Sequence, residues 1–226
     1  MKKLLVLFAL LCIVSFSVNS CKPDDDYVAK DWPIPQEVLD YYFFKKSTFW
    51  VFENDKTGEK DTLRVENTNK YWIDGSRGDR FEQGDVFIKS SLDGYTYHYY
   101  VNTQGSAGCI RDGKNNRPCY SIYCTKYKPG NFVGESSFLF YPFQKDYGGQ
   151  ADGSLQTSII RMVDKKDSME IETLSLKDVL IVNISNSIVS NRKNMTFYWA
   201  KGKGLIQKDN LTDNQTWKLI DHMITM

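Results

Sequence analysis

From residue 48 onward the chain is built from short runs in which apolar side chains alternate with polar or aromatic ones. Phe49, Val51 and Glu53 alternate with Trp50, Phe52 and Asn54. Residues 55–59 are turn-forming, and a second alternating run follows at 62–65. Two such runs around a short turn predict a β-hairpin.

Further short strands are expected along the rest of the chain, separated by breaks rich in Gly, Asp and Asn. They are expected at residues 71–73, 86–89, 95–101, 120–127, 137–141, 157–163, 169–174, 179–184, 195–199, 205–208 and 216–220. Residues 36–44 carry the only helical pattern, long enough for one or two turns. This arrangement predicts a mainly β fold: an antiparallel curved sheet, as a sandwich or an open barrel.

The N-terminus has the layout of a secretory signal peptide. Lys2 and Lys3 precede an apolar run over 4–14, small residues occupy 15–20, and Cys21 follows. The uncharged stretch 4–18 is shorter than the ~20 residues that a membrane-spanning helix needs. We therefore expect a signal peptide at 1–20, a tether at 21–35 and one β domain at 36–226.

The end of this segment, Val18-Asn19-Ser20-Cys21, resembles a bacterial lipobox. The acidic cluster Asp24-Asp25-Asp26 resembles the export signal of surface lipoproteins in Bacteroidota. The resemblance implies that Cys21 is lipidated and that the protein is anchored in the outer membrane, exposed at the cell surface. An ordinary signal peptidase site with an incidental cysteine is the alternative.

Three segments of the body resemble uncharacterised lipoproteins of the same bacteria. They are the aromatic run 42–52, the glycine-containing hairpin 198–206 and the closing strand 217–220. This resemblance implies a curved β-sheet and no particular activity.

Composition narrows the function classes. The 226 residues carry 29 Lys+Arg and 28 Asp+Glu, and the net charge of +1 leaves no excess of positive charge for nucleic acid. His98 and His222 are the only histidines, which disfavours a Ser-His-Asp or Cys-His catalytic set. Export makes ATP and nicotinamide cofactors improbable partners. We expect no cofactor and no metal.

Cys109, Cys119 and Cys124 are the cysteines near the middle of the chain. In an oxidising compartment we expect Cys109 to pair with Cys119 or with Cys124. A zinc site and three free thiols are the alternatives, but the spacing is not one that zinc sites use. Residues 108–115 match a phosphate-binding loop only until Asn115 replaces the required Ser or Thr.

Tyr95, Tyr97 and Tyr99 share one face of a strand and are candidate ligand contacts, although core packing is the commoner role of such residues. His98 is expected to be a hydrogen-bonded neighbour of tyrosine. Acidic residues in glycine-rich or polar loops are weaker candidates. For a hydrolase they are Glu135, Asp146 and Asp152, and for calcium Asp209, Asp213 and two nearby asparagines.

These observations favour a non-enzymatic, membrane-anchored lipoprotein that binds an envelope component, glycan or protein. A carrier of a lipid or other apolar ligand inside the curved sheet is the first alternative, and a carboxylate-dependent hydrolase is the second.

Overall fold

The computed structural model describes residues 28–75, 77–103, 120–129, 131–141, 143, 148–153, 156–171, 174–185, 190–191 and 193–225. This part of the chain holds one short helix, α2 (Gln36–Tyr42), and thirteen strands. The strands are β1 (Asp31–Trp32), β2 (Phe49–Asn54), β3 (Lys60–Asp74), β4 (Arg80–Ser90), β5 (Thr96–Asn102), β6 (Tyr120–Lys128), β7 (Asn131–Tyr141), β8 (Gly148–Gly153), β9 (Gln156–Ile171), β10 (Leu174–Ser185), β11 (Met195–Ala200), β12 (Gly204–Asn210) and β13 (Gln215–Met223).

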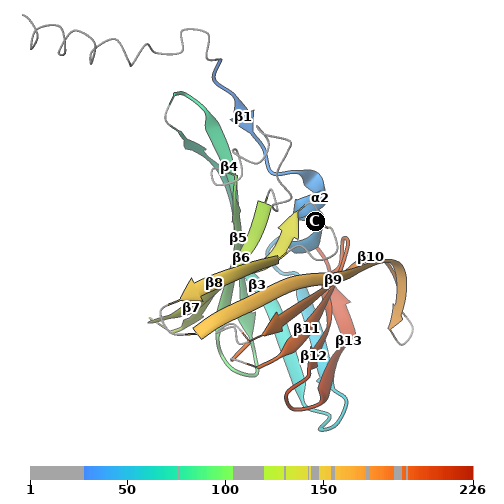
Figure 1. The fold of residues 1–226 in the computed structure, drawn as a ribbon. Helices are drawn as coiled ribbons and strands as arrows, with labels where there is room; N and C mark the ends of the chain where they lie inside the picture. Colours follow the sequence, from blue (N-terminus) through green and yellow to red (C-terminus); the bar gives the residue numbers. More distant parts are fainter. Residues whose placement is uncertain are drawn as a thin grey trace, which may run out of the picture.

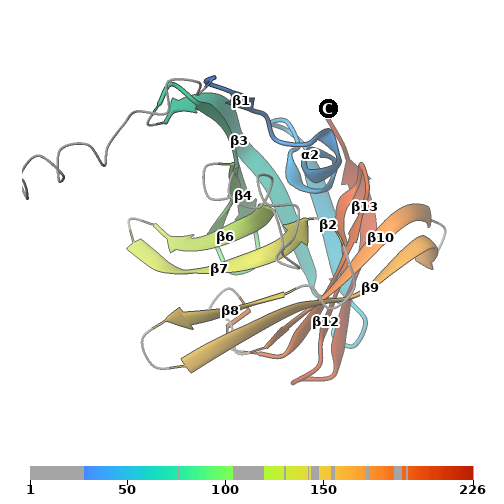
Figure 2. The same ribbon diagram turned by 45° about the horizontal axis from the view of Figure 1, so that its top comes forward.

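Twelve of the strands form one continuous antiparallel sheet in the order β7-β6-β5-β4-β3-β2-β13-β12-β11-β10-β9-β8. The first and last long strands, β2 and β13, are neighbours in its middle. The sheet curls until its edge strands β7 and β8 approach each other without pairing in the described residues (Figures 1 and 2). The predicted mainly β fold is thus confirmed, as one open, strongly curved sheet.

Irregular pairings accompany this curvature. The register shifts at Val65/Asn67, Ile181/Val182, Tyr198/Trp199 and Leu219/Asp221, where the extra residue lies on β3, β9, β12 and β13 respectively. An extra residue on one strand increases local twist and bends the strand. Bulges on both halves of the sheet therefore help to bring its edges toward each other.

Helix α2 covers one end of the curved sheet (Figure 2). It buries Val38, Leu39, Tyr41 and Tyr42. Tyr41 donates a hydrogen bond to the carbonyl of Asp178 in β10 at 3.0 Å, and Tyr42 donates one to the carbonyl of Gly84 in β4 at 3.2 Å. Because β4 and β10 lie on opposite sides of the sheet, the helix ties the two walls together at this end.

Several predicted boundaries are wrong. The runs 62–65 and 71–73 belong to one long strand, β3, and the expected strand at 169–174 is split, because β9 ends at Ile171 and β10 begins at Leu174. The glycine-rich stretch 148–153, expected to be turns, is strand β8.

The end of the expected tether belongs to the folded domain. Asp31 and Trp32 form strand β1, which pairs in parallel with β4. Ile34 is buried, and its backbone N–H donates to Glu82 at 2.8 Å. The folded domain therefore begins before residue 36. Among the described residues, no helix has the length and apolar character needed to cross a membrane.

Candidate functional site

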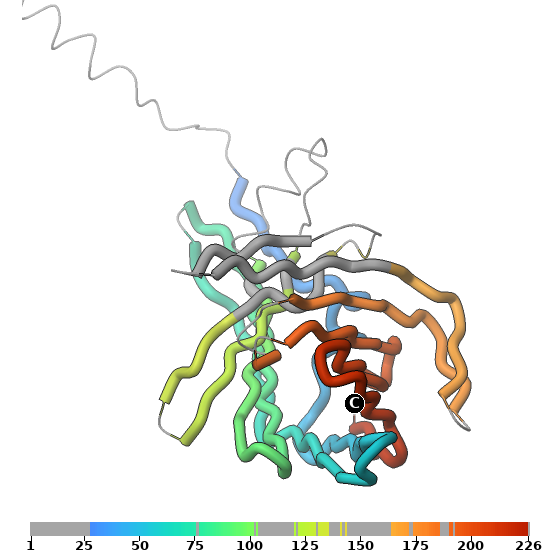
Figure 3. Tube along the Cα trace, turned by 60° about the horizontal axis from the view of Figure 1, so that its bottom comes forward, coloured from blue at the N-terminus to red at the C-terminus, as the bar shows by residue number. Residues whose placement is uncertain are grey.

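The inner face of the sheet encloses a cavity of about 260 Å³ at the end opposite α2. Hairpin turns surround this end, which comes forward in Figure 3. Its walls come mainly from β3, β5 and β6 on one side and from β11, β12 and β13 on the other. The lining residues are Asp61, Leu63, Leu92, Asp93, Tyr97, Tyr99, Cys124, Ser190, Asn191, Lys193, Met195, Phe197, Leu205, Lys208, Asn210, Gln215 and Trp217.

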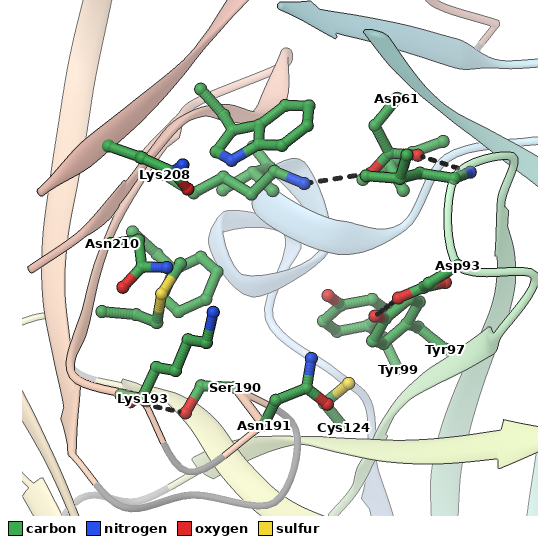
Figure 4. A pocket seen from close by; sticks show the side chains of 17 residues that line it. Asp61, Asp93, Tyr97, Tyr99, Cys124, Ser190, Asn191, Lys193, Lys208 and Asn210 are labelled. Atoms are coloured by element: carbon green, nitrogen blue, oxygen red, sulfur yellow. Dashed lines mark hydrogen bonds and ion pairs between the residues drawn. The ribbon is translucent and has the colours of Figure 1, made fainter. Parts of the chain in front are cut away.

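A buried ion pair joins the two walls. Lys208 Nζ in β12 lies 3.0 Å from Asp61 Oδ2 in β3, and the two side chains are 17% and 5% exposed (Figure 4). The other oxygen of Asp61 accepts hydrogen bonds from Ser90 Oγ at 2.8 Å and from the Leu92 backbone at 3.4 Å. Among the described residues, Ser90, Leu92 and Lys208 all donate to this carboxylate, so Asp61 acts as a structural acceptor.

Aromatic rings form much of the remaining wall. Tyr97 and Tyr99 project from β5, Phe197 from β11 and Trp217 from β13. Lys208 Nζ lies 5.0 Å from the centre of the Trp217 ring, within cation–π range. Tyr97 donates to Asp93 at 2.8 Å, and burial together with the charge of Asp93 raises the pKa of Tyr97. This tyrosine therefore stays a neutral hydrogen-bond donor.

Lys126 packs behind this wall as a buried ammonium. Its Nζ donates to Asn191 Oδ1 at 2.6 Å and lies 3.9 Å from the centre of the Tyr95 ring. Burial lowers the pKa of Lys126. Because an ammonium can only donate, it fixes the amide of Asn191 with the oxygen toward Lys126 and the NH₂ group on the other side.

A second polar cluster lies where the chain enters β11. Lys193 forms an ion pair with Asp213, whose carboxylate also accepts from Asn210 Nδ2 at 2.8 Å. These hydrogen bonds lower the pKa of Asp213, that from Lys193 contributing most. Asn210 Oδ1 in turn accepts from the Asp213 backbone at 3.1 Å, so both ends of its amide are bonded within the protein.

Between the cavity and α2, the interior is packed. The apolar residues of this region leave only about 10 Å³ of open space among them. They are Tyr42, Phe44, Trp50, Leu63, Ile88, Tyr99, Trp199 and Leu205. Among the residues that the structure describes, the concave face is thus filled beside the helix and hollow at the hairpin end.

Two of the three tyrosines singled out from the sequence lie at the cavity. Tyr97 and Tyr99 line it, and Tyr99 is only 7% exposed. Tyr95 precedes β5 and is not part of the lining; its ring covers Lys126 instead. The three residues therefore do not form an exposed ladder, because this side of β5 faces the interior.

The cysteine predictions have a mixed outcome. Cys124 is a free, fully buried thiol, so the expected pairing of Cys109 with Cys124 is not formed. Burial raises the pKa of Cys124 to about 12, which keeps it an unreactive thiol at neutral pH. Cys109 and Cys119 lie outside the described residues, as do Cys21, Asp24, Asp25, Asp26 and the glycine-rich loop 108–115.

The outer face of the same strands carries an aromatic row, of which sequence reasoning had named His98 as a neighbour of tyrosine. Phe87, His98, Tyr100 and Tyr123 stack in succession, with ring centres 4.2, 5.0 and 5.2 Å apart. His98 stacks on Tyr100, as a neighbour of tyrosine, but its hydrogen-bond partner is a carboxylate, because His98 Nε2 lies 3.0 Å from Asp85 Oδ1. The inner rings of this row have both faces covered by their neighbours, which makes the row a poor platform for a sugar.

The acidic candidates do not converge on the cavity. Glu135 lies on the outer face, where it accepts from Tyr100 at 2.7 Å and from Thr125 at 3.1 Å. Asp209 accepts from Tyr198 and Gln207, both at 2.8 Å, and Asp213 is held by Lys193. Asp146 lies outside the described residues, and nothing is described of the side chain of Asp152.

The cavity residues missed by sequence reasoning include Asp61, Asn191, Lys193 and Lys208. Asp61 has a local signal, because it shares the face of β3 that buries Leu63 and Val65. Lys208 has no comparable signal in the sequence. The β-bulge in the β11–β12 pairing interrupts the alternation of inward and outward side chains along β12, so the pattern does not place Lys208 on the inner face.

Within the described part of the chain, no group of three His, Cys, Asp or Glu side chains is arranged to hold a metal ion. Comparisons with models of protein families, with curated proteins and with solved structures found no match.

Proposed function

We propose that this protein is a non-enzymatic lipoprotein, anchored in the bacterial outer membrane through Cys21, that binds a saccharide of the cell envelope in the cavity of its curved sheet. The anchor rests on the lipobox-like sequence that ends at Cys21, and surface exposure rests on Asp24, Asp25 and Asp26. The binding function is carried by one observation, the mixed aromatic and polar lining of the cavity.

That lining suits a sugar for a physical reason. A pyranose ring has apolar C–H faces and a rim of hydroxyl groups, so a site for it needs aromatic surfaces beside hydrogen-bonding groups. The aromatic surfaces come from Tyr97, Tyr99 and Trp217. The hydrogen-bonding groups come from Asn191, Lys193 and Lys208. Ligand sites commonly combine apolar walls with a few placed polar groups in this way.

The size of the cavity also favours a small ligand. Sites for drug-sized ligands typically enclose about 300–1,000 Å³, and this cavity encloses about 260 Å³. One or two sugar units at the end of a longer glycan match that volume better than the acyl chains of a lipid. Among the described residues beneath α2, the open space of about 10 Å³ is too small for such chains.

A carrier of a small apolar ligand is the second candidate. Leu63, Met195, Phe197 and Leu205 favour it, because they give the cavity a continuous apolar side. The buried pair of Asp61 and Lys208 counts against it, because an apolar ligand would further desolvate two charges without offering them hydrogen bonds.

Binding can be tested with the full mature protein in detergent and a panel of soluble envelope oligosaccharides, using calorimetry and tryptophan fluorescence. We expect a saccharide to bind and Trp217→Ala to weaken that binding about tenfold or more. Trp72→Ala is the matched control: Trp72 is 40% exposed on β3, is not part of the cavity lining, and its loss should leave affinity unchanged.

The same panel should include a fatty acid and a small aromatic compound. Binding of these, with no binding of any saccharide, would contradict the proposal and favour the carrier. Equal effects of Trp217→Ala and Trp72→Ala would show that saccharide binding occurs outside the cavity.

A further inference from the structure

The hydrogen bonds inside the cavity are unevenly distributed between donors and acceptors. The two carboxylates of its wall already receive hydrogen bonds from the protein. Asp61 accepts from Ser90, Leu92 and Lys208, and Asp93 accepts from the Tyr95 backbone at 2.9 Å and from Tyr97 at 2.8 Å. A ligand entering the cavity therefore meets acceptors that are largely occupied.

The hydrogen-bond donors of the wall include two lysine ammonium groups. An ammonium group has three N–H bonds. Lys208 directs one of them to Asp61, and Lys193 directs one to Asp213. Figure 4 shows the Lys193 side chain rising into the space between the walls, opposite the pair formed by Lys208 and Asp61. Two cationic groups from different segments thus face one space, and among the described residues each has one hydrogen-bond acceptor.

Asn191 adds a third hydrogen-bond donor, because a neighbouring lysine fixes the orientation of its side-chain amide. Its oxygen is held by Lys126 at 2.6 Å, and Lys126 is itself fixed against the Tyr95 ring. The NH₂ group is consequently the part of the amide left for the cavity. Lys126 and Tyr95 act here as positioning residues, since they orient Asn191 and neither belongs to the cavity lining.

We infer that the ligand of this cavity is an acidic saccharide, one that carries a carboxylate or a sulfate group placed between Lys193 and Lys208. The inference rests on the proposed saccharide-binding function and specifies its ligand class. An anionic group supplies two or three acceptor oxygens and no donor, which complements a site whose unused groups are donors. Charge-assisted hydrogen bonds are also about twice as strong as neutral ones.

The test compares matched pairs of oligosaccharides on the full mature protein in detergent, measured by calorimetry. The pairs are galacturonate against galactose, glucuronate against glucose, and a sulfated against an unsulfated galactose oligomer. We expect at least one acidic member to bind about tenfold or more tightly than its neutral partner. Lys193→Gln should remove most of that preference, and Lys193→Arg, which keeps charge and donors, should preserve it.

Lys201→Gln is the matched control. Lys201 is 43% exposed and paired with Asp40 at 3.6 Å, much as Lys193 is 41% exposed and paired with Asp213, but Lys201 does not line the cavity. Its replacement should leave the acidic preference intact. Lys193 is partly exposed, and a thermal melt of each variant confirms that it is folded.

The outcomes separate this inference from the proposed function. Equal affinity for the acidic and the neutral member of every pair would overturn the inference that the ligand is acidic. The proposal that the cavity binds a saccharide would remain. Binding of no saccharide at all would overturn the proposed function and this inference together. If Lys193→Gln and Lys201→Gln reduce the preference for the acidic saccharide equally, the preference arises from the overall charge of the protein. That result would overturn the assignment of the acidic group to the cavity.

Discussion

Lys208 Nζ lies 3.0 Å from Asp61 Oδ2, although the two residues are 147 positions apart and their strands, β12 and β3, are separated in the sheet by β2 and β13. The pair can form only because the sheet curls strongly enough for side chains of non-adjacent strands to meet across its concave face. The ion pair therefore depends on the same curvature of the sheet that creates the cavity.

Breaking this pair should destabilise the fold. Asp61→Ala leaves the largely desolvated Lys208 side chain, 17% exposed, without its counter-charge, and we expect a loss of about 3 kcal/mol in the free energy of unfolding, measured with urea. The exposed pair of Glu53 and Lys60, with side chains 41% and 60% exposed, is the control, and Glu53→Ala should cost less than about 1 kcal/mol. Similar losses at the two sites would show that the inner pair is not desolvated.

Gly204 is expected to tolerate no side chain. Its φ is +78°, and an added Cβ would lie 2.9 Å from Phe44 and 3.1 Å from Trp50. Gly204→Ala should therefore cost about 2–4 kcal/mol in unfolding free energy, from backbone strain and overpacking together. Gly94 isolates the backbone part, since its φ is +67° with no atom within 4 Å, and Gly94→Ala should cost only about 1–2 kcal/mol. Equal costs would contradict the close packing around Gly204.

The thiols should divide into one free and two bridged. With Cys21 replaced by Ala, the unfolded and unreduced mature protein should show one free thiol, Cys124, identified by mass spectrometry after alkylation. In the folded protein Cys124 should resist thiol reagents at pH 8, because it is fully buried and its pKa is raised to about 12. Three free thiols after unfolding would show that Cys109 and Cys119 form no bridge.

Cys21 should carry the lipid anchor. Radiolabelled palmitate fed to expressing cells should label the wild-type protein and not the Cys21→Ala variant, because the thioether at this cysteine is the attachment point in lipoproteins of the kind that the sequence resembles. Two or more acyl chains would hold the protein stably at the membrane. Equal labelling of both proteins would exclude the lipoprotein interpretation.

The acidic cluster should govern surface display. Replacing Asp24, Asp25 and Asp26 with Ala should protect the protein from protease added to intact cells, while the wild type is digested. Lysed cells provide the control, in which both proteins should be digested equally. Unchanged digestion on intact cells would remove the export role of these residues.

The amino-acid sequence by itself determined the location of most strands and which side chains share a face of each. Alternation of period two follows from local backbone geometry, so it placed Tyr97 and Tyr99 on one side of β5 and the hairpin of β2 and β3 at nearly the right residues. Local sequence signals failed where pairing with a neighbouring strand outweighs the intrinsic preference of the residues. The glycine-rich strand β8 is one example, held by its ladder with β9 despite its poor intrinsic preference for a strand.

Only the tertiary structure decided which face became the interior and which distant residues met there. The direction of curling depends on the order of twelve strands and on bulges whose positions no local pattern marks. That choice turned Tyr97 and Tyr99 inward, put the His98 row outside, and brought Lys208 to Asp61. The cavity exists because the whole sheet is curled: each strand supplies a few inward-facing side chains, and their partners come from strands elsewhere in the chain.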